Sequence, residues 1–337
     1  MCTCIDVRRS SVLLLGVLAG TLLLAMTSVQ DSDRGTAELC KRKMLKIQDM
    51  VGSSDLKMQI DMAAVGQPGV VLNLSGTGES MFVLDGTGWL NVSEIDRAQA
   101  IDYMGYRTDL NQYFLLNMSP DRTALSYMAG DFIRNGVMKM TDPMSQVTAE
   151  MAIGKKGTKS TVRVPPNQAT FMSMENTPSA RKTGDVLKTL MSGPIRPASV
   201  NRSADNPNPA DNYNRAHRLL QKFSGDFTTD DGFKASSRMV AEGRYLLTHV
   251  TAPSEFLAFM SYSSAGGFFQ QMLVGPDLAV PIYMQGPLQA DGSILMSDPF
   301  DPNGMKVVIT FEANGAYSTR TTMGDQVVEQ RTWKPEP

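Results

Sequence analysis

Short runs in which apolar and polar residues alternate make up most of this chain. In the stretch 127–143, Met138 and Met140 fall on one face of the expected strand and Lys139 on the other, because successive side chains of a strand point to opposite faces. Asn135-Gly136 and Asp291-Gly292 are typical of tight hairpin turns, in which we expect positive φ at both residues. The pattern predicts antiparallel strands in a barrel or sandwich.

One hairpin-like stretch occurs twice. The sequence YMAGDFIRNGVMKMTDP at 127–143 returns as YMQGPLQADGSILMSDP at 283–299. At this offset of 156, residues 103–144 match 259–300 without a gap, with 11 identities in 42 positions; roughly two or three would arise by chance. DGTGWL, ending at Leu90, meets AEGRYL, ending at Leu246, at the same offset, and GTKST at Gly157 meets GAYST at Gly315. A tandem duplication is therefore predicted.

A helical pattern precedes each copy, at 37–51 and 214–225, and each pattern leads into a glycine, the residue favoured just past a helix end. The segment 192–212 has four prolines and few large apolar residues, which is typical of a linker. The helix-then-strands order keeps an α+β fold as the alternative. The predicted domains are listed by range: a membrane anchor or signal at 1–30, a diverged first repeat at 36–180, the linker at 192–212 and a second repeat at 213–335.

The N-terminus carries the clearest targeting signal. Arg8 and Arg9 precede an uncharged run of eighteen residues, Val12–Val29; as a helix it would cover roughly 27 Å, enough for the hydrocarbon layer. Basic residues before such a run favour a cytoplasmic N-terminus. We predict a transmembrane helix that anchors the protein, with the bulk of the chain extracytoplasmic (periplasmic). Cleavage after Thr27 is the alternative and would yield a secreted protein.

Composition and charge argue against several classes of function and point to none. The net charge is -2 without a basic block, so no nucleic-acid partner is expected. Cys2 and Cys4 precede the apolar run, so Cys40 stands alone in the exported part and no disulfide forms there. The two histidines, His217 and His249, have no counterpart in the first copy. We expect no catalytic residues, no metal ligands and no cofactor, and we class the chain as a non-enzyme.

The second copy resembles the domain of unknown function 1579 family, which is related to lipocalin-like barrels. The motifs that carry this resemblance are SGDF (224–227), GRYL (243–246), MSY (260–262) and RTWK (331–334). The first copy keeps DGTGWL and MGY but lacks the arginine of the G-R motif and a clear closing strand. The resemblance implies two tandem lipocalin-like β-barrels, the first one diverged. It implies no activity.

The interior of such barrels is the candidate ligand site. Eight residues alternate onto one face of their strands: Met104, Tyr106, Met138 and Met140 in the first copy, and Met260, Tyr262, Ile294 and Met296 in the second. Barrels of this size either fill their interior with side chains or keep a cavity for an apolar or amphipathic ligand. A cell-envelope structural or interaction module with filled barrels is therefore the alternative function.

One difference between the copies suggests a docking surface. Lys139, on the outer face of the first copy, corresponds to Leu295 in the second. We expect Leu295 to lie in an apolar outer patch through which the two repeats, or a repeat and a partner, pack together.

Overall fold

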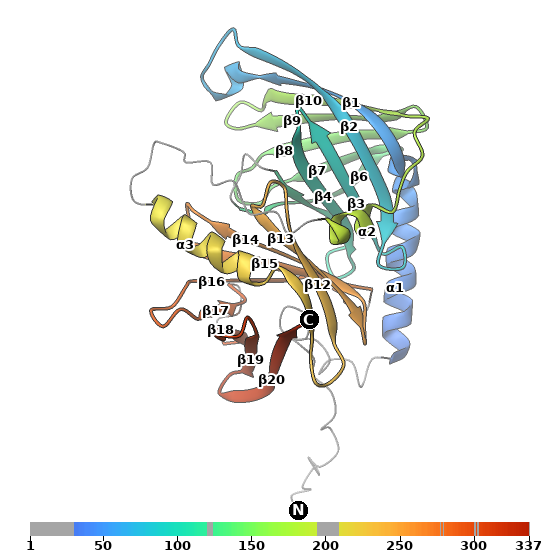
Figure 1. Ribbon diagram of the computed structural model, residues 1–337. Helices are drawn as coiled ribbons and strands as arrows, with labels where there is room; N and C mark the ends of the chain where they lie inside the picture. Colours follow the sequence, from blue (N-terminus) through green and yellow to red (C-terminus); the bar gives the residue numbers. More distant parts are fainter. Residues whose placement is uncertain are drawn as a thin grey trace, which may run out of the picture.

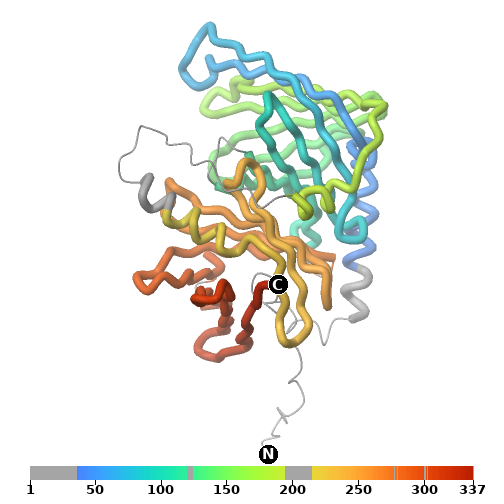
Figure 2. Tube along the Cα trace, viewed as in Figure 1, coloured from blue at the N-terminus to red at the C-terminus, as the bar shows by residue number. Residues whose placement is uncertain are grey.

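The computed structural model describes residues 30–119, 124–193, 209–276, 278, 280–299, 301 and 303–336. The fold is mainly β, with two closed antiparallel barrels in tandem (Figure 1). The chain completes the first barrel before it enters the second, as the colours of Figure 2 show. This excludes the α+β alternative. It also shows that the diverged first repeat closes, through β9 and β10.

Each barrel has ten strands. Those of the first are β1 Gly52–Asp61, β2 Val71–Val83, β3 Gly88–Ile95, β4 Ala98–Arg107, β5 Gln112–Met118, β6 Ser126–Arg134, β7 Val137–Thr141, β8 Thr148–Gly154, β9 Gly157–Val164 and β10 Ala169–Pro178. Those of the second are β11 Gly225–Thr228, β12 Lys234–Val240, β13 Tyr245–Ala252, β14 Phe256–Ser263, β15 Phe268–Val274, β16 Ile282–Gly286, β17 Ile294–Ser297, β18 Met305–Phe311, β19 Tyr317–Met323 and β20 Gln326–Pro335. Closure comes from β1 with β10 and from β11 with β20.

Helices precede both barrels, as the sequence predicts. Before the first, α1 (Gln30–Met44) continues into a 3-10 helix, η1 (Leu45–Met50); before the second lies α3 (Pro209–Lys222). Both begin earlier than predicted, and α3 takes in the end of the predicted linker; residues 194–208 lie outside the described part of the chain. Two shorter helices are η2 (Met62–Val65) and α2 (Val186–Ser192).

Strand pairing supports the duplication and corrects its alignment at both ends. Gly130 pairs with Tyr113 as Gly286 pairs with Phe269, at an offset of 156. Upstream, however, Trp89 pairs with Met104 and Leu246 pairs with Met260. Trp89 is therefore the equivalent of Leu246 and not of Tyr245, because the second barrel has one residue fewer between these partners.

The downstream extension is also one residue out of register. Met151 pairs with Ser160, and its equivalent Ile309 pairs with Thr319. Ser160 therefore corresponds to Thr319 rather than to Ser318. The duplicated unit keeps its strand pairing, and the insertions fall in the turns.

Two equivalent glycines let neighbouring strands approach closely. A Cβ on Gly130 would lie 1.9 Å from the carbonyl oxygen of Lys139, and one on Gly286 would lie 1.6 Å from that of Leu295. Such distances are far shorter than any contact between non-bonded atoms, so both positions require glycine for a steric reason rather than a conformational one.

The hairpin turns differ from the expectation. Gly136 (φ 67°) and Gly292 (φ 88°) have positive φ, but Asn135 and Asp291 do not. Arg134 and Val137 pair on either side of the Asn135-Gly136 turn, and a bulge lies between Phe132 and Arg134. The bulge supplies the twist that a two-residue turn with two positive φ values would otherwise provide.

The outer faces of the two barrels share one hydrophobic core. Tyr103 on β4 and Phe259 on β14, which are equivalent residues, meet with ring centroids 5.2 Å apart. The Tyr245 hydroxyl lies within hydrogen-bonding distance of the carbonyl oxygens of Ser119 (3.2 Å) and Ala124 (3.1 Å). The cluster also takes in α2, and its buried members are Val83, Leu84, Leu90, Ile101, Tyr103, Phe114, Leu116, Met118, Leu125, Val186, Leu187, Leu190, Met191, Val240, Ala241, Tyr245, Leu247, Leu257, Phe259, Met272 and Val274.

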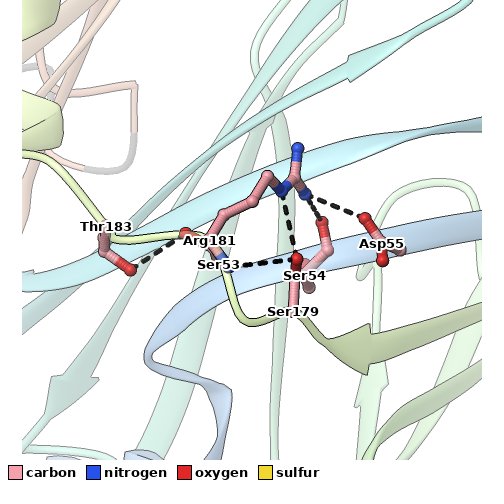
Figure 3. Close-up of polar contacts among 6 residues, drawn as sticks. All are labelled: Ser53, Ser54, Asp55, Ser179, Arg181 and Thr183. Atoms are coloured by element: carbon pink, nitrogen blue, oxygen red, sulfur yellow. Dashed lines mark hydrogen bonds and ion pairs between the residues drawn. The ribbon is translucent and has the colours of Figure 1, made fainter.

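The segment that joins β10 to α2 is tied to the outside of β1 (Figure 3). The guanidinium of Arg181 donates to the Ser54 carbonyl oxygen (2.6 Å) and to Asp55 Oδ1 (3.0 Å). The hydroxyls of Ser53 and Thr183 lie 3.0 Å apart. Because this segment leads into α2, these contacts set the position of the helix between the barrels.

The docking role of Leu295 and the membrane helix at 12–29 remain predictions. Leu295 lies half-buried on β17 and is not a member of the hydrophobic core between the barrels, so its docking role stays a prediction. The predicted membrane helix at 12–29 lies outside the described residues. Within the described part of the chain, no helix is long and apolar enough to cross a membrane.

Candidate functional site

The eight predicted interior residues lie inside the barrels, where they belong to packed cores. Those of the first copy share one cluster, and those of the second copy share another. Each is at most 6 % exposed. Strand alternation therefore placed them on the correct face. Their burial makes them core residues, and their part in ligand binding stays a prediction.

In the first barrel this core closes the end that carries the β2–β3 and β4–β5 turns. Met44 and Ile47, from α1 and η1, are fully buried in the same cluster as Met104. The Tyr113 hydroxyl donates to the Lys43 carbonyl oxygen (2.7 Å), and the Cys40 thiol lies 3.7 Å from the Tyr106 carbonyl oxygen. Burial raises the pKa of Cys40 to about 11. The helices thus seal one end of the barrel.

A row of polar side chains crosses the inner wall directly above this core. Direct cross-strand pairing places them side by side on β2 to β6, in the order Ser80, Asn91, Asp102, Asn117 and Ser126. They point inward because they lie two residues along their strands from interior core residues such as Phe82, Trp89 and Met104. We call these five residues the polar row.

Asp102 is the centre of the polar row. Its carboxylate accepts a hydrogen bond from Asn117 Nδ2 (2.7 Å) and another from Asn91 Nδ2 (3.1 Å). Burial raises the pKa of Asp102, and the hydrogen bonds from the two amides partly offset that rise. Asn91, Asp102, Asn117 and Ser126 are half-buried. Their remaining accessible surface indicates that side chains do not completely fill the barrel at this level.

The opposite inner wall is rich in methionine. Met58 pairs with Met174, and Ile60 pairs with Met172, which in turn pairs with Val162. All five are half-buried, and Leu72, the other neighbour of Ile60, is 43 % exposed at the end away from α1. The unsealed end of the first barrel therefore leads to a lumen with one polar wall and one flexible, polarizable wall.

Asp102 has no charged partner in this lumen. Strand alternation over β1–β10 places every described lysine, arginine, histidine and other carboxylate of these strands on the outer face. The other titratable groups of the interior are Cys40, Tyr106 and Tyr113. A carboxylate that is desolvated without a counter-charge is costly, so Asp102 is the chemically distinctive group of the barrel.

The interior of the second barrel is filled. Its residues equivalent to Asn91, Asp102 and Asn117 are Thr248, Ala258 and Leu273, each at most 1 % exposed. Charge is present on β20, where Arg331 lies 2.8 Å from Glu329 and also pairs with Asp231. The Arg331 guanidinium lies 4.1 Å from the ring centroid of Phe233. The Arg331 charge is therefore paired with the buried carboxylate of Glu329 and the exposed carboxylate of Asp231.

The two histidines and Asp142, which precedes Pro143, have structural roles. His217 is buried and bonded to the Gly243 carbonyl oxygen, and His249, on the outer face of β13, lies 2.8 Å from Glu255. Asp142 accepts from the backbone N–H groups of Met144 (2.8 Å) and Ser145 (3.2 Å), as expected of a turn residue. Among the described residues no group of three or more His, Cys, Asp or Glu side chains could hold a metal ion.

A groove of about 530 Å³ lies between the barrels beside α2. Its lining includes Val92, Leu190 and Met239 together with the carboxylates of Glu79 and Glu242. These carboxylates lie outside the barrels, so the groove is separate from the polar row.

Sequence reasoning missed the polar row, although a signal was present. In the strand AQAIDYMGYR (98–107), Asp102 lies two residues before Met104, so a period of two places it on the interior face. Asn91 and Asn117 follow the same rule relative to Trp89 and Leu115. A lone carboxylate on the apolar face of a strand could have been identified as a candidate site.

Comparison with known proteins gives no family assignment. No family model matches the chain, and no curated protein matches it. A protein of unknown function from the DUF3598 family of Nostoc punctiforme aligns over 88 % of this chain and 99 % of its own, at 9 % identity and a TM-score of 0.28. A porin-like protein from Bacteroides uniformis aligns over 85 % of this chain and 96 % of its own length, at 8 % identity and a TM-score of 0.16. These scores support no conclusion on function, and the resemblance to the 1579 family stays a prediction.

Proposed function

We propose that this protein is a membrane-anchored, extracytoplasmic tandem barrel whose first barrel binds a small amphipathic molecule. The single observation that carries the proposal is the polar row, centred on Asp102 and half-buried at four of its five residues, opposite a methionine-rich wall. A polar head group fits the first wall and an apolar body the second. The uncharged run after Arg8 and Arg9 supports the anchor.

The second barrel supports a structural role. Its interior is packed and its charges are paired, and its outer face shares a hydrophobic core with the first barrel. We therefore assign ligand binding to the first barrel and support of that barrel to the second. A module in which both barrels are structural is the second candidate, and the filled second barrel favours it.

Native mass spectrometry of the full chain, purified from its own host, tests the proposal. We expect a co-purifying small molecule on the wild-type protein. Ala100→Phe, on the inner face of β4 beside the polar row, should fill the lumen and remove that mass. Ala152→Phe makes the same substitution at an exposed position on the outer face of β8 and should retain it. A wild-type protein without a bound molecule, or equal occupancy in both variants, would favour the structural module.

A further inference from the structure

We propose that the ligand of the first barrel carries a protonated amine and that Asp102 is its counter-ion. This inference rests on the proposed function, since it identifies the head group of the molecule bound in the lumen. The two features that carry it are the position of Asp102 on the inner wall and the absence of any other charged side chain on the inner face of the described strands.

The hydrogen bonds around Asp102 hold its carboxylate ready for a cation. Asn117 and Asn91 each donate an amide hydrogen to one of its two oxygens. A carboxylate oxygen has further lone pairs after accepting one hydrogen bond, and both Asp102 oxygens can therefore accept from a third donor in the lumen. The two amides orient the carboxylate but bring no positive charge. A protonated amine would supply the missing charge together with up to three N–H donors.

The rest of the interior suits a cation with an apolar body. The hydroxyls of Ser126 and Ser93 face the lumen as additional acceptors, and the Oδ1 atom of Asn176 on β10 is buried without a hydrogen-bond partner. Met58, Met172 and Met174 offer polarizable sulfur and flexible chains to an alkyl segment. An anionic head group would face Asp102 without any basic residue to receive it. The geometry therefore disfavours fatty acids and other organic anions.

Three probes of one length separate the head group from the apolar body. Hexylamine, hexan-1-ol and hexanoate are titrated by calorimetry into the full chain in lipid nanodiscs, with empty nanodiscs as the reference. At pH 7.5 we expect hexylamine to bind at least about tenfold more tightly than hexan-1-ol, as for a charge-assisted hydrogen bond, and hexanoate to bind most weakly. Asp102→Asn should remove the preference for the amine. Glu94→Gln, which removes an exposed carboxylate on the outer face of β3, should keep it.

A pH series on the wild-type protein tests the role of Asp102 independently of how well the Asp102→Asn variant folds. In the wild-type protein, hexylamine affinity should fall as pH is lowered through the pKa of Asp102, since the carboxylate becomes neutral while the amine stays charged. Hexan-1-ol affinity should not change. Equal binding of amine and alcohol at every pH would overturn the amine inference and leave the proposed function standing. If none of the three probes binds, the proposed function itself is wrong.

Discussion

The two barrels have the same strand pairing but carry the charged side chains of their inner faces on opposite walls. In the first, Asn91, Asp102 and Asn117 lie on β3 to β5; the equivalent positions of the second hold Thr248, Ala258 and Leu273. In the second, Glu329 and Arg331 lie on β20, where the first barrel has Met172 and Met174 on β10.

This difference shows how a duplicated barrel can specialise without a change of fold. The second copy neutralises its interior charge with its own residues, through Arg331, Glu329 and Asp231. The first copy leaves Asp102 uncompensated and keeps accessible surface around it. A neutralised, filled interior favours stability, and an uncompensated one favours binding. The predictions below test this contrast, from the largest effect to the smallest.

The largest effect is expected at Arg331. Arg331→Met gives the second barrel the residue type of the first and removes the guanidinium that lies 2.8 Å from the buried carboxylate of Glu329. Breaking a buried ion pair from one side costs about 3–5 kcal/mol. Met174→Ala, at the equivalent half-buried position of the first barrel, should cost less than half as much. Urea unfolding of the full chain measures both, and a second substitution, Glu329→Gln, should recover part of the loss. Equal effects at the two positions would contradict the contrast.

Gly130→Ala and Gly286→Ala should weaken the two barrels to a similar degree. Each added Cβ meets the carbonyl oxygen of the neighbouring strand, and we expect overpacking to cost about 1–3 kcal/mol. Gly154→Ala is the matched control, because nothing lies within 4 Å of its added Cβ. Thermal unfolding compares the three variants. If Gly286→Ala leaves the unfolding temperature unchanged, the close approach of the strands is not shared by the two copies.

The contact between Tyr103 and Phe259 should couple the barrels. A double-mutant cycle with Tyr103→Ala and Phe259→Ala should give a coupling energy of about 0.5–1.5 kcal/mol, as for other aromatic pairs. Tyr103→Ala with Met284→Ala is the control, since Met284 belongs to the interior cluster of the second barrel. Additive effects of the first pair would show that the barrels fold independently of this contact.

The smallest effect concerns the pH dependence of the ligand-free protein. Because burial raises the pKa of Asp102 in the folded state, the folded protein binds its proton more tightly than the unfolded chain does. The resulting destabilisation is absent below the unfolded pKa and complete above the folded one, so this residue lowers stability as pH rises. Asp102→Asn should raise the unfolding midpoint at pH 8 and make it less dependent on pH. Parallel pH curves for variant and wild type would contradict the assignment.

Sequence patterns predicted antiparallel strands in a barrel or sandwich because strands leave periodic, local signals, and the choice of tandem barrels came from the family resemblance. Strand alternation placed Met104 and Met260 inside, and the repeat gave the equivalence of the hairpins around Gly130 and Gly286. The alignment slipped at Leu90 and Ser160 because turn lengths differ between the copies. It matched identical residues, such as Leu90 with Leu246, although a one-residue slip places the matched side chains on opposite faces.

The candidate site was harder to predict because it depends on what an interior lacks. Met140 and Met174 both face the interior of the first barrel, but one is fully buried and the other half-buried. That difference comes from α1 and η1, which seal only one end. To recognise that no cation lies near Asp102, one must also know whether each charged strand residue faces inward or outward. The sequence pattern gives these directions only once the strand register is known.

Photocrosslinking tests the central claim most directly, that the first barrel holds a ligand and the second does not. A six-carbon alkylamine with a diazirine on its chain is irradiated with the full chain in nanodiscs, and labelled peptides are mapped by mass spectrometry. We predict labels on lumen residues of the first barrel, such as Met58, Met172 and Met174, which excess hexylamine removes. Labels confined to the second barrel, or to outer faces and insensitive to competition, would contradict the account.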